Sequence, residues 1–195
     1  MKVNNAHIDA TAIHEAGHAV AALQKGRYVS CVTASHNDPG TGLTFLGRTN
    51  SINPFEGVDS ISAVSASWEW QLRWAKEEMK ISLAGPLAEA KALGKPLRTP
   101  GAILDFRDCI RVANQLNRFS RTYSRLYPLL FMPGYHVMNQ ARASTRRWVA
   151  QPKIWRMIVT IARHLSERGK LFGPDLCYLI GTSGEDWEQK VIRLR

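Results

Sequence analysis

The chain of 195 residues is 45% hydrophobic and carries a formal net charge of +10 at pH 7. This length and apolar content predict a single globular domain over residues 1–195, and the lack of any apolar run near about 18 residues excludes a membrane-spanning helix. The positive charge permits a nucleic acid, an acidic partner or an acidic substrate, although no helix-turn-helix, zinc-finger or RNA-binding motif accompanies it.

The first predicted element is a helix from about residue 7 to residue 25. Between residues 10 and 24 its only ionisable side chains are His14, Glu15 and His18, so the helix is apolar nearly all round and we expect it to be buried. The two histidines are four residues apart and leave the same face of the helix, one turn from each other. A bound metal ion would remove the cost of burying these three side chains without partners.

The run His14-Glu15-Ala16-Gly17-His18 has the His-Glu-x-x-His spacing that is typical of zincin metallopeptidases. The two neutral imidazoles would hold Zn²⁺, and Glu15 is placed to take a proton from the metal-bound water rather than to act as a third ligand. Gly17 costs about 1 kcal/mol of helix propensity relative to alanine. Its missing side chain therefore predicts a close approach by another segment or by substrate.

The middle of the chain is predicted to contain a small β-hairpin followed by helices. The hairpin covers about residues 28–48, with a turn at Asn37-Asp38-Pro39-Gly40. A helix is predicted from Ala63 to Leu83. Gly85-Pro86 is expected to break or kink the chain, because proline has no backbone N–H to donate, and a short helix over residues 87–93 follows it.

The rest of the chain is predicted to be helical. A long helix over about residues 102–123 shows apolar residues at helical spacing, and further helices make up a C-terminal part over about residues 137–180. The predicted fold class is therefore mainly α, with one small β-hairpin.

A catalytic zinc site needs a third protein ligand and leaves one position open for water. Asp105 is favoured on local grounds, because it lies in the first turn of the helix over residues 102–123, where the helix dipole stabilises a carboxylate. A purely structural acid at the helix start is the alternative. Glu89 could be a ligand, a partner for a histidine Nδ1–H or a surface acid. The other candidate ligands are His7, His36, His136, His164 and Asp108.

Four segments of the chain together resemble the peptidase domain of the FtsH-type zinc metalloproteases. The first of them matches the metal helix of that family nearly residue for residue. The segments are residues 11–21, residues 32–33 with 41–44, residues 83–89, and residues 101–105 with 110–114. In this family an aspartate is the third ligand, which implies Asp105 here, and the implied fold is a helical zincin-type peptidase domain.

The sequence departs from the family pattern at three points. The glycine pair followed by arginine of the family is Ala84-Gly85-Pro86 here, and the asparagine that usually precedes the aspartate is Leu104. The chain also contains no Gly-x-x-x-x-Gly-Lys-Ser/Thr phosphate loop. The ATPase module that family members use to unfold substrates is therefore missing from these residues.

The resemblance implies a zinc metalloendopeptidase that hydrolyses peptide bonds in unfolded or flexible protein segments without its own ATPase. In this hypothesis His14, His18 and Asp105 bind Zn²⁺, and Glu15 accepts a proton from the attacking water. An extended peptide pairs with an edge strand formed by Thr41, Gly42, Leu43, Thr44 and Phe45. The alternative is a non-catalytic or weakly catalytic zinc-binding adaptor or regulatory module that docks on a partner protein or nucleic acid.

The resemblance and the cysteines also bear on partners and location. FtsH-type peptidase domains assemble into rings and work with an ATPase, so a homo-oligomer and a separate ATPase or other protein partner are expectations here. Three widely spaced cysteines fit neither a disulfide framework nor a cysteine zinc site. Because no secretory signal is visible either, we expect a cytoplasmic protein.

The positive charge is concentrated after residue 106. A solvated helix surface is the simpler interpretation, and a functional basic surface is the alternative. The arginines concerned are Arg107, Arg111, Arg118, Arg121, Arg125, Arg142, Arg146 and Arg147.

Overall fold

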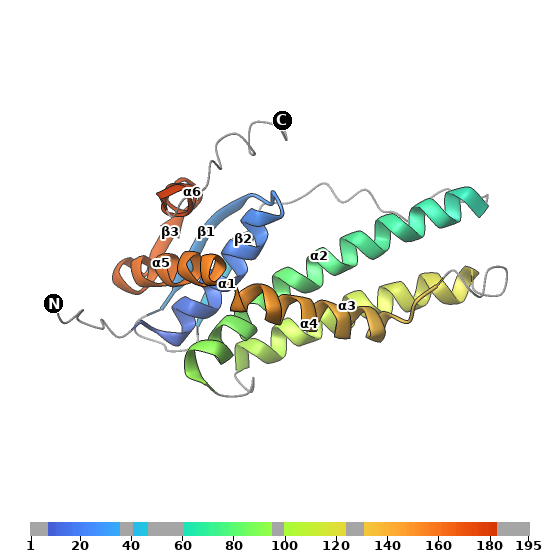
Figure 1. Ribbon diagram of the computed structural model, residues 1–195, viewed down its shortest axis with the longest axis horizontal. Helices are drawn as coiled ribbons and strands as arrows, with labels where there is room; N and C mark the ends of the chain where they lie inside the picture. Colours follow the sequence, from blue (N-terminus) through green and yellow to red (C-terminus); the bar gives the residue numbers. More distant parts are fainter. Residues whose placement is uncertain (1–7, 36–40, 47–60, 95–99, 124–130, 183–195) are drawn as a thin grey trace.

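The helix that carries the His-Glu-x-x-His motif packs against the sheet and against two of the other helices (Figure 1). The computed structural model describes residues 8–35, 41–46, 61–94, 100–123 and 131–182, and within these ranges the protein is mainly α, with six helices and a three-stranded antiparallel sheet. The elements are α1 (Ala10–Gln24), β1 (Val29–Ala34), β2 (Gly42–Leu46), α2 (Ile61–Leu93), α3 (Pro100–Tyr123), α4 (Gly134–Ala150), α5 (Pro152–Arg168), β3 (Lys170–Phe172) and α6 (Gly173–Thr182). The mainly α prediction is confirmed.

Helix α1 is buried along most of its length. It begins later than the predicted residue 7, because the side chain of Asp9 caps it by accepting a hydrogen bond from the backbone N–H of Thr11 at 3.0 Å. Every residue from 11 to 22 is buried, as the apolar composition indicates. A Cβ atom at Gly17 would lie 2.7 Å from the carbonyl oxygen of Ala84, so α2 makes the close approach that this glycine predicts.

The sheet has the order β2-β1-β3 and is antiparallel throughout. Strands β1 and β2 pair as the predicted hairpin requires, and its predicted turn at Asn37-Asp38-Pro39-Gly40 lies outside the described residues. The sheet also contains β3, which the sequence pattern does not predict. Three residues are too few to show an alternating pattern, and β3 is defined by its pairing of Leu171 with Val32. Within the described residues β2 is an edge strand. Its Leu43 and Phe45 are exposed, and the strand packs on α1.

The predicted break of the helix at Gly85-Pro86 is wrong, because α2 is one helix from Ile61 to Leu93 with Pro86 inside it. Proline removes one backbone hydrogen bond from a helix. The buried residues around it, Leu83, Ala84, Leu87 and Ala88, belong to the core, and α1 packs against α2 more extensively than against any other element. This packing outweighs the loss of one hydrogen bond.

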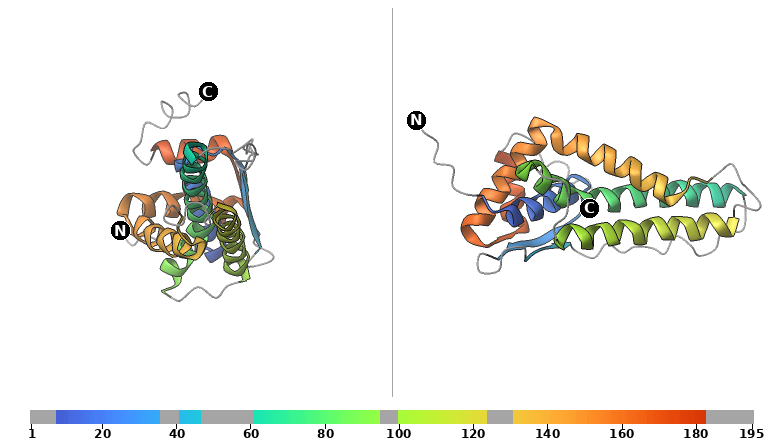
Figure 2. Two further views of the ribbon diagram at one scale, coloured as in Figure 1. Left: turned by 90° about the vertical axis from the view of Figure 1, so that its right-hand side faces the viewer. Right: turned by 90° about the horizontal axis from the view of Figure 1, so that it is seen from below.

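Helices α2 and α3 run side by side from α1 to the far end of the molecule, and α4 packs on both of them (Figures 1 and 2). At that far end the rings of Trp68, Phe119 and Phe131 contact one another. The other end of α3 lies next to α1, as the contact of Asp105 with its histidines shows. The predicted C-terminal helices are present as α4, α5 and α6. No helix in the described ranges combines the length and the apolar character that crossing a membrane requires.

Candidate metal centre

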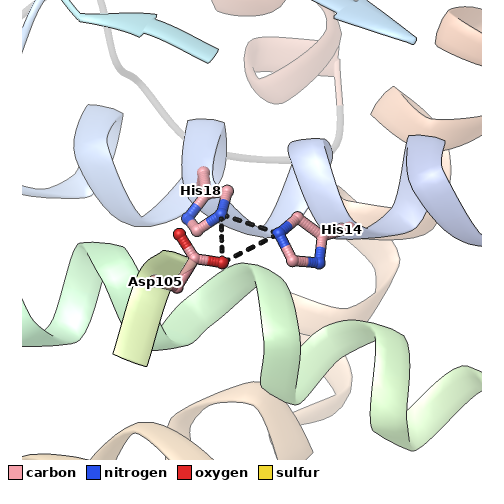
Figure 3. A group of neighbouring side chains, drawn as sticks. All are labelled: His14, His18 and Asp105. Atoms are coloured by element: carbon pink, nitrogen blue, oxygen red, sulfur yellow. Dashed lines mark hydrogen bonds and ion pairs between the residues drawn. The ribbon is translucent and has the colours of Figure 1, made fainter. Parts of the chain in front are cut away.

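Three side chains from two helices converge on one point (Figure 3). The Nε2 atoms of His14 and His18 on α1 are 3.1 Å apart, and Oδ2 of Asp105 on α3 lies 3.0 Å from the first and 3.4 Å from the second. Both histidines are buried, and the side chain of Asp105 is 18% exposed. In the described part of the chain this trio forms a group that could hold a metal ion.

The spacing of the three donor atoms fits zinc. Bonds of about 2.0–2.1 Å in a tetrahedron separate neighbouring ligand atoms by about 3.3 Å. The observed separations of 3.0, 3.1 and 3.4 Å lie close to this value. Oδ2 of Asp105 is also buried without a hydrogen bond among the described residues. A cation at the centre of the trio would satisfy this oxygen.

The hydrogen bonds on the far side of each imidazole fix which ring nitrogen is free. Nδ1 of His14 lies 2.9 Å from Oε2 of Glu89, and Nδ1 of His18 lies 2.8 Å from the carbonyl oxygen of Ile81. A carbonyl and a carboxylate only accept, so each Nδ1 carries the proton of the neutral ring. In neutral rings both Nε2 lone pairs would face Asp105, which is the arrangement of metal-binding histidines.

The electrostatics of the trio favour a positive charge at its centre. Burial alone would lower the pKa of His14, but its close contacts with Asp105 and Glu89 outweigh burial and raise that pKa to about 9. Burial alone would raise the pKa of Asp105, but the two histidines lower it to about 2. A metal ion must displace a proton from this group, so its affinity will fall as the pH falls.

Glu15 lies beside the trio and is held by strand β2. The hydroxyl of Thr44 donates a hydrogen bond to Oε2 of Glu15 at 2.6 Å. A Cβ atom at Gly42 would lie 2.6 Å from Cγ of Glu15, so only glycine lets the strand pass this close. The carboxylate is therefore fixed at the metal centre by two residues of the predicted substrate-binding strand.

The metal centre opens into a cleft of about 310 Å³ between β2 and α3. Among the predicted substrate-binding residues, the three central ones border this cleft, whereas Thr41 and Phe45 do not. The described residues that line it are His14, Glu15, His18, Gly42, Leu43, Thr44, Leu46, Ile81, Ser82, Leu104, Asp105 and Asp108. The cleft thus makes both the trio and Glu15 accessible from outside.

The structure also separates the competing ligand candidates. Glu89 contacts the back of His14 rather than joining the trio. His136 contacts Gln140 on α4 and His164 lies near Glu167 on α5, and neither belongs to the trio. Asp108 pairs with an arginine of its own helix. His7 and His36 lie outside the described residues.

Two parts of the site were not assigned from the sequence. The carbonyl group of Ile81 orients His18, and a backbone acceptor carries no signal in the residue type. Gly85 is interpreted as a helix breaker, but a Cβ atom there would lie 2.4 Å from Nε2 of His18. An isolated glycine in a helical pattern can also mark a position where another group packs closely against the backbone. Gly85 is such a position, because the imidazole of His18 packs against it.

Comparison with known proteins adds no relative. No protein-family model matches the sequence, and no curated protein matches it either.

Replacing Gly85 with alanine should disrupt the metal centre. The added methyl group would overlap the imidazole of His18, and a ligand must stay within about 0.2 Å of its bond length. We expect Gly85→Ala to weaken zinc binding by about 100-fold or more, measured by competition with a chromophoric chelator. Gly181→Ala is the control, because a Cβ atom there meets nothing within 4 Å. Equal zinc affinity of the two variants would contradict this geometry.

Replacing Glu89 with glutamine tests the contact behind His14. Glutamine can still accept the Nδ1–H hydrogen bond but loses the negative charge that makes the imidazole a stronger donor to a metal. Changes to such partners cost about 10–100-fold in metal affinity, and we expect the lower end, about 10-fold, for Glu89→Gln. The same competition assay measures it. Glu69→Gln, at an exposed position of the same helix, should bind zinc like the unmodified protein.

Proposed function

We propose that the protein is a zinc-dependent metalloendopeptidase of the FtsH type. The observation that carries this proposal is the convergence of two imidazole Nε2 atoms and a carboxylate oxygen beside a fixed glutamate in an open cleft. Three protein ligands with room for a water molecule are the arrangement of catalytic rather than structural zinc sites. The order of residues in the motif helix supports the same class.

The residues of the chain then have distinct tasks in hydrolysis. Zinc, when bound, supplies the Lewis acidity that lowers the pKa of a water molecule to about 7. His14, His18 and Asp105 would hold the ion. Glu15 accepts the proton of the attacking water and returns it to the leaving amine, and Thr44 keeps the carboxylate in position by its hydrogen bond.

Strand β2 supports a polypeptide as the substrate. It is an edge strand within the described residues, and its exposed Leu43 borders the cleft. An extended peptide can add to such an edge by backbone hydrogen bonds, and this pairing requires a substrate segment that is not already folded. We therefore propose unfolded or flexible protein segments as substrates.

A digestion assay tests the proposal. The purified chain, loaded with one equivalent of zinc, should cleave a fluorescently quenched unfolded protein such as casein. Treatment with 1,10-phenanthroline should abolish cleavage, and added zinc should restore it. Stoichiometric zinc without any cleavage would contradict the proposal and favour the non-catalytic zinc-binding module. Cleavage that resists the chelator would assign the activity to another site or a contaminant.

A further inference from the structure

A second hollow, of about 480 Å³, lies along α3 beyond the metal centre. Its described lining comes from one face of that helix over about three turns. The lining residues are Arg107, Ile110, Arg111, Asn114, Gln115 and Arg118. Three guanidinium groups and two carboxamides face this hollow, which we call the arginine groove, and no carboxylate is among these residues.

The cations of the arginine groove are available to a ligand. In the described part of the chain, the guanidinium groups of Arg107 and Arg118 have no acidic partner. Arg111 contacts Asp108 at 3.1 Å, but both side chains of this pair are more than half exposed. An exposed ion pair contributes little and exchanges readily. A carboxylate ligand could therefore bind here without breaking a buried interaction.

The arginine groove continues the metal cleft. Asp108 lines the cleft, Arg111 lines the groove, and the two side chains are in contact. The 12 residues from Arg107 to Arg118 span about 16 Å, because they are separated by 11 rises of about 1.5 Å each. At about 3.3 Å per residue, an extended peptide covers this distance with about five residues. A chain that leaves the metal centre along α3 would thus enter the groove.

We propose that the arginine groove binds an acidic segment of the substrate, so that preferred substrates carry a block of about five residues rich in aspartate and glutamate on one side of the cleaved bond. This inference rests on the proposed peptidase function. Guanidinium groups pair with carboxylates through two parallel hydrogen bonds, and carboxamides can bind the peptide backbone between them. The net charge of +10 attracts acidic chains from a distance.

The residues at the cleft end of the groove favour a polypeptide over a nucleic acid. Glu15, Asp105 and Asp108 all line the adjoining cleft. With the charge of Asp105 offset by the metal ion, a phosphate backbone that continued from the groove into the cleft would still meet the carboxylates of Glu15 and Asp108 and be repelled by them. A peptide carries no obligatory charge and can be acidic in the groove and neutral in the cleft.

The test compares quenched peptides that share one cleavable core. One has four glutamates on the carboxyl side of the core, one has them on the amino side, and a third has glutamines instead. With the zinc-loaded full chain at low salt, one acidic peptide should show a kcat/KM about 5- to 10-fold above the glutamine peptide, as expected for a few exposed ion pairs. The double variant Arg107→Gln/Arg118→Gln should lose this preference and keep its activity on the glutamine peptide.

The control is Arg156→Gln/Arg163→Gln, which removes the same charge from exposed positions on α5 and should keep the preference. Equal rates on all peptides would overturn the groove proposal and leave the peptidase proposal standing. If no peptide is cleaved, the peptidase proposal fails. Fluorescence anisotropy of the labelled acidic peptides then still tests whether the arginine groove binds an acidic segment. Binding that the Arg107→Gln/Arg118→Gln variant retains, or tighter binding of single-stranded DNA of equal charge, would overturn it.

Discussion

Glu15→Gln is expected to lower the rate of peptide hydrolysis by about 10²–10⁴-fold while zinc stays bound, because general acid–base catalysis contributes about that factor. Glutamine has nearly the shape of glutamate, and its carbonyl oxygen can still accept the hydrogen bond from Thr44. It cannot accept the proton of the attacking water. Steady-state kinetics on a quenched peptide and elemental analysis of the same sample measure both effects.

The matched control for Glu15→Gln is Glu69→Gln, which makes the same chemical change at an exposed position of α2 and should leave hydrolysis unchanged. Activity that survives Glu15→Gln would remove this carboxylate from the mechanism. Asp108 would then be the next carboxylate to consider, since it lines the same cleft. The non-catalytic alternative makes a different prediction, namely that neither the unmodified protein nor the variant hydrolyses anything.

The part of the site that the sequence predicts is the part encoded in one helix. The spacing of His14 and His18 fixes their common face, and the apolar residues around them predict burial, which the structure shows. Gly17 likewise predicts the close approach of a second backbone. Glycine lowers the helix propensity at this position, and in return it leaves room for the backbone of Ala84. These inferences need no knowledge of other elements.

The parts that the sequence leaves open depend on contacts between distant segments. The residues alone leave several candidates for the third ligand, and the family resemblance singles out Asp105, whose oxygen the structure places beside both imidazoles. Glu89 has three alternative roles in the sequence, and the structure places it behind His14. The continuity of α2 through Pro86 is set by packing against α1, which no local rule includes. Strand β3 also depends on a distant segment, because its three residues are a strand only through their pairing with β1.

Asp105→Asn is expected to remove zinc from the protein almost completely. The change keeps the size of the side chain but replaces the negative oxygen that lies 3.0 and 3.4 Å from the two Nε2 atoms. Loss of a partner outside the ligand set already costs about 10–100-fold in affinity, so loss of a charged ligand should cost more than about 100-fold. Zinc content after dialysis and chelator competition both measure it.

The fold should survive Asp105→Asn, because the side chain lies at the cleft and not in the apolar core. Circular dichroism of the metal-free variant checks this. Asp108→Asn is the matched control: it makes the same change one turn further along α3, at an exposed residue that lines the same cleft, and it should bind zinc normally. If the two variants bound zinc equally well, the carboxylate of Asp105 would not be a ligand. The site would then have only its two histidines, and two ligands from one helix do not hold a catalytic zinc ion.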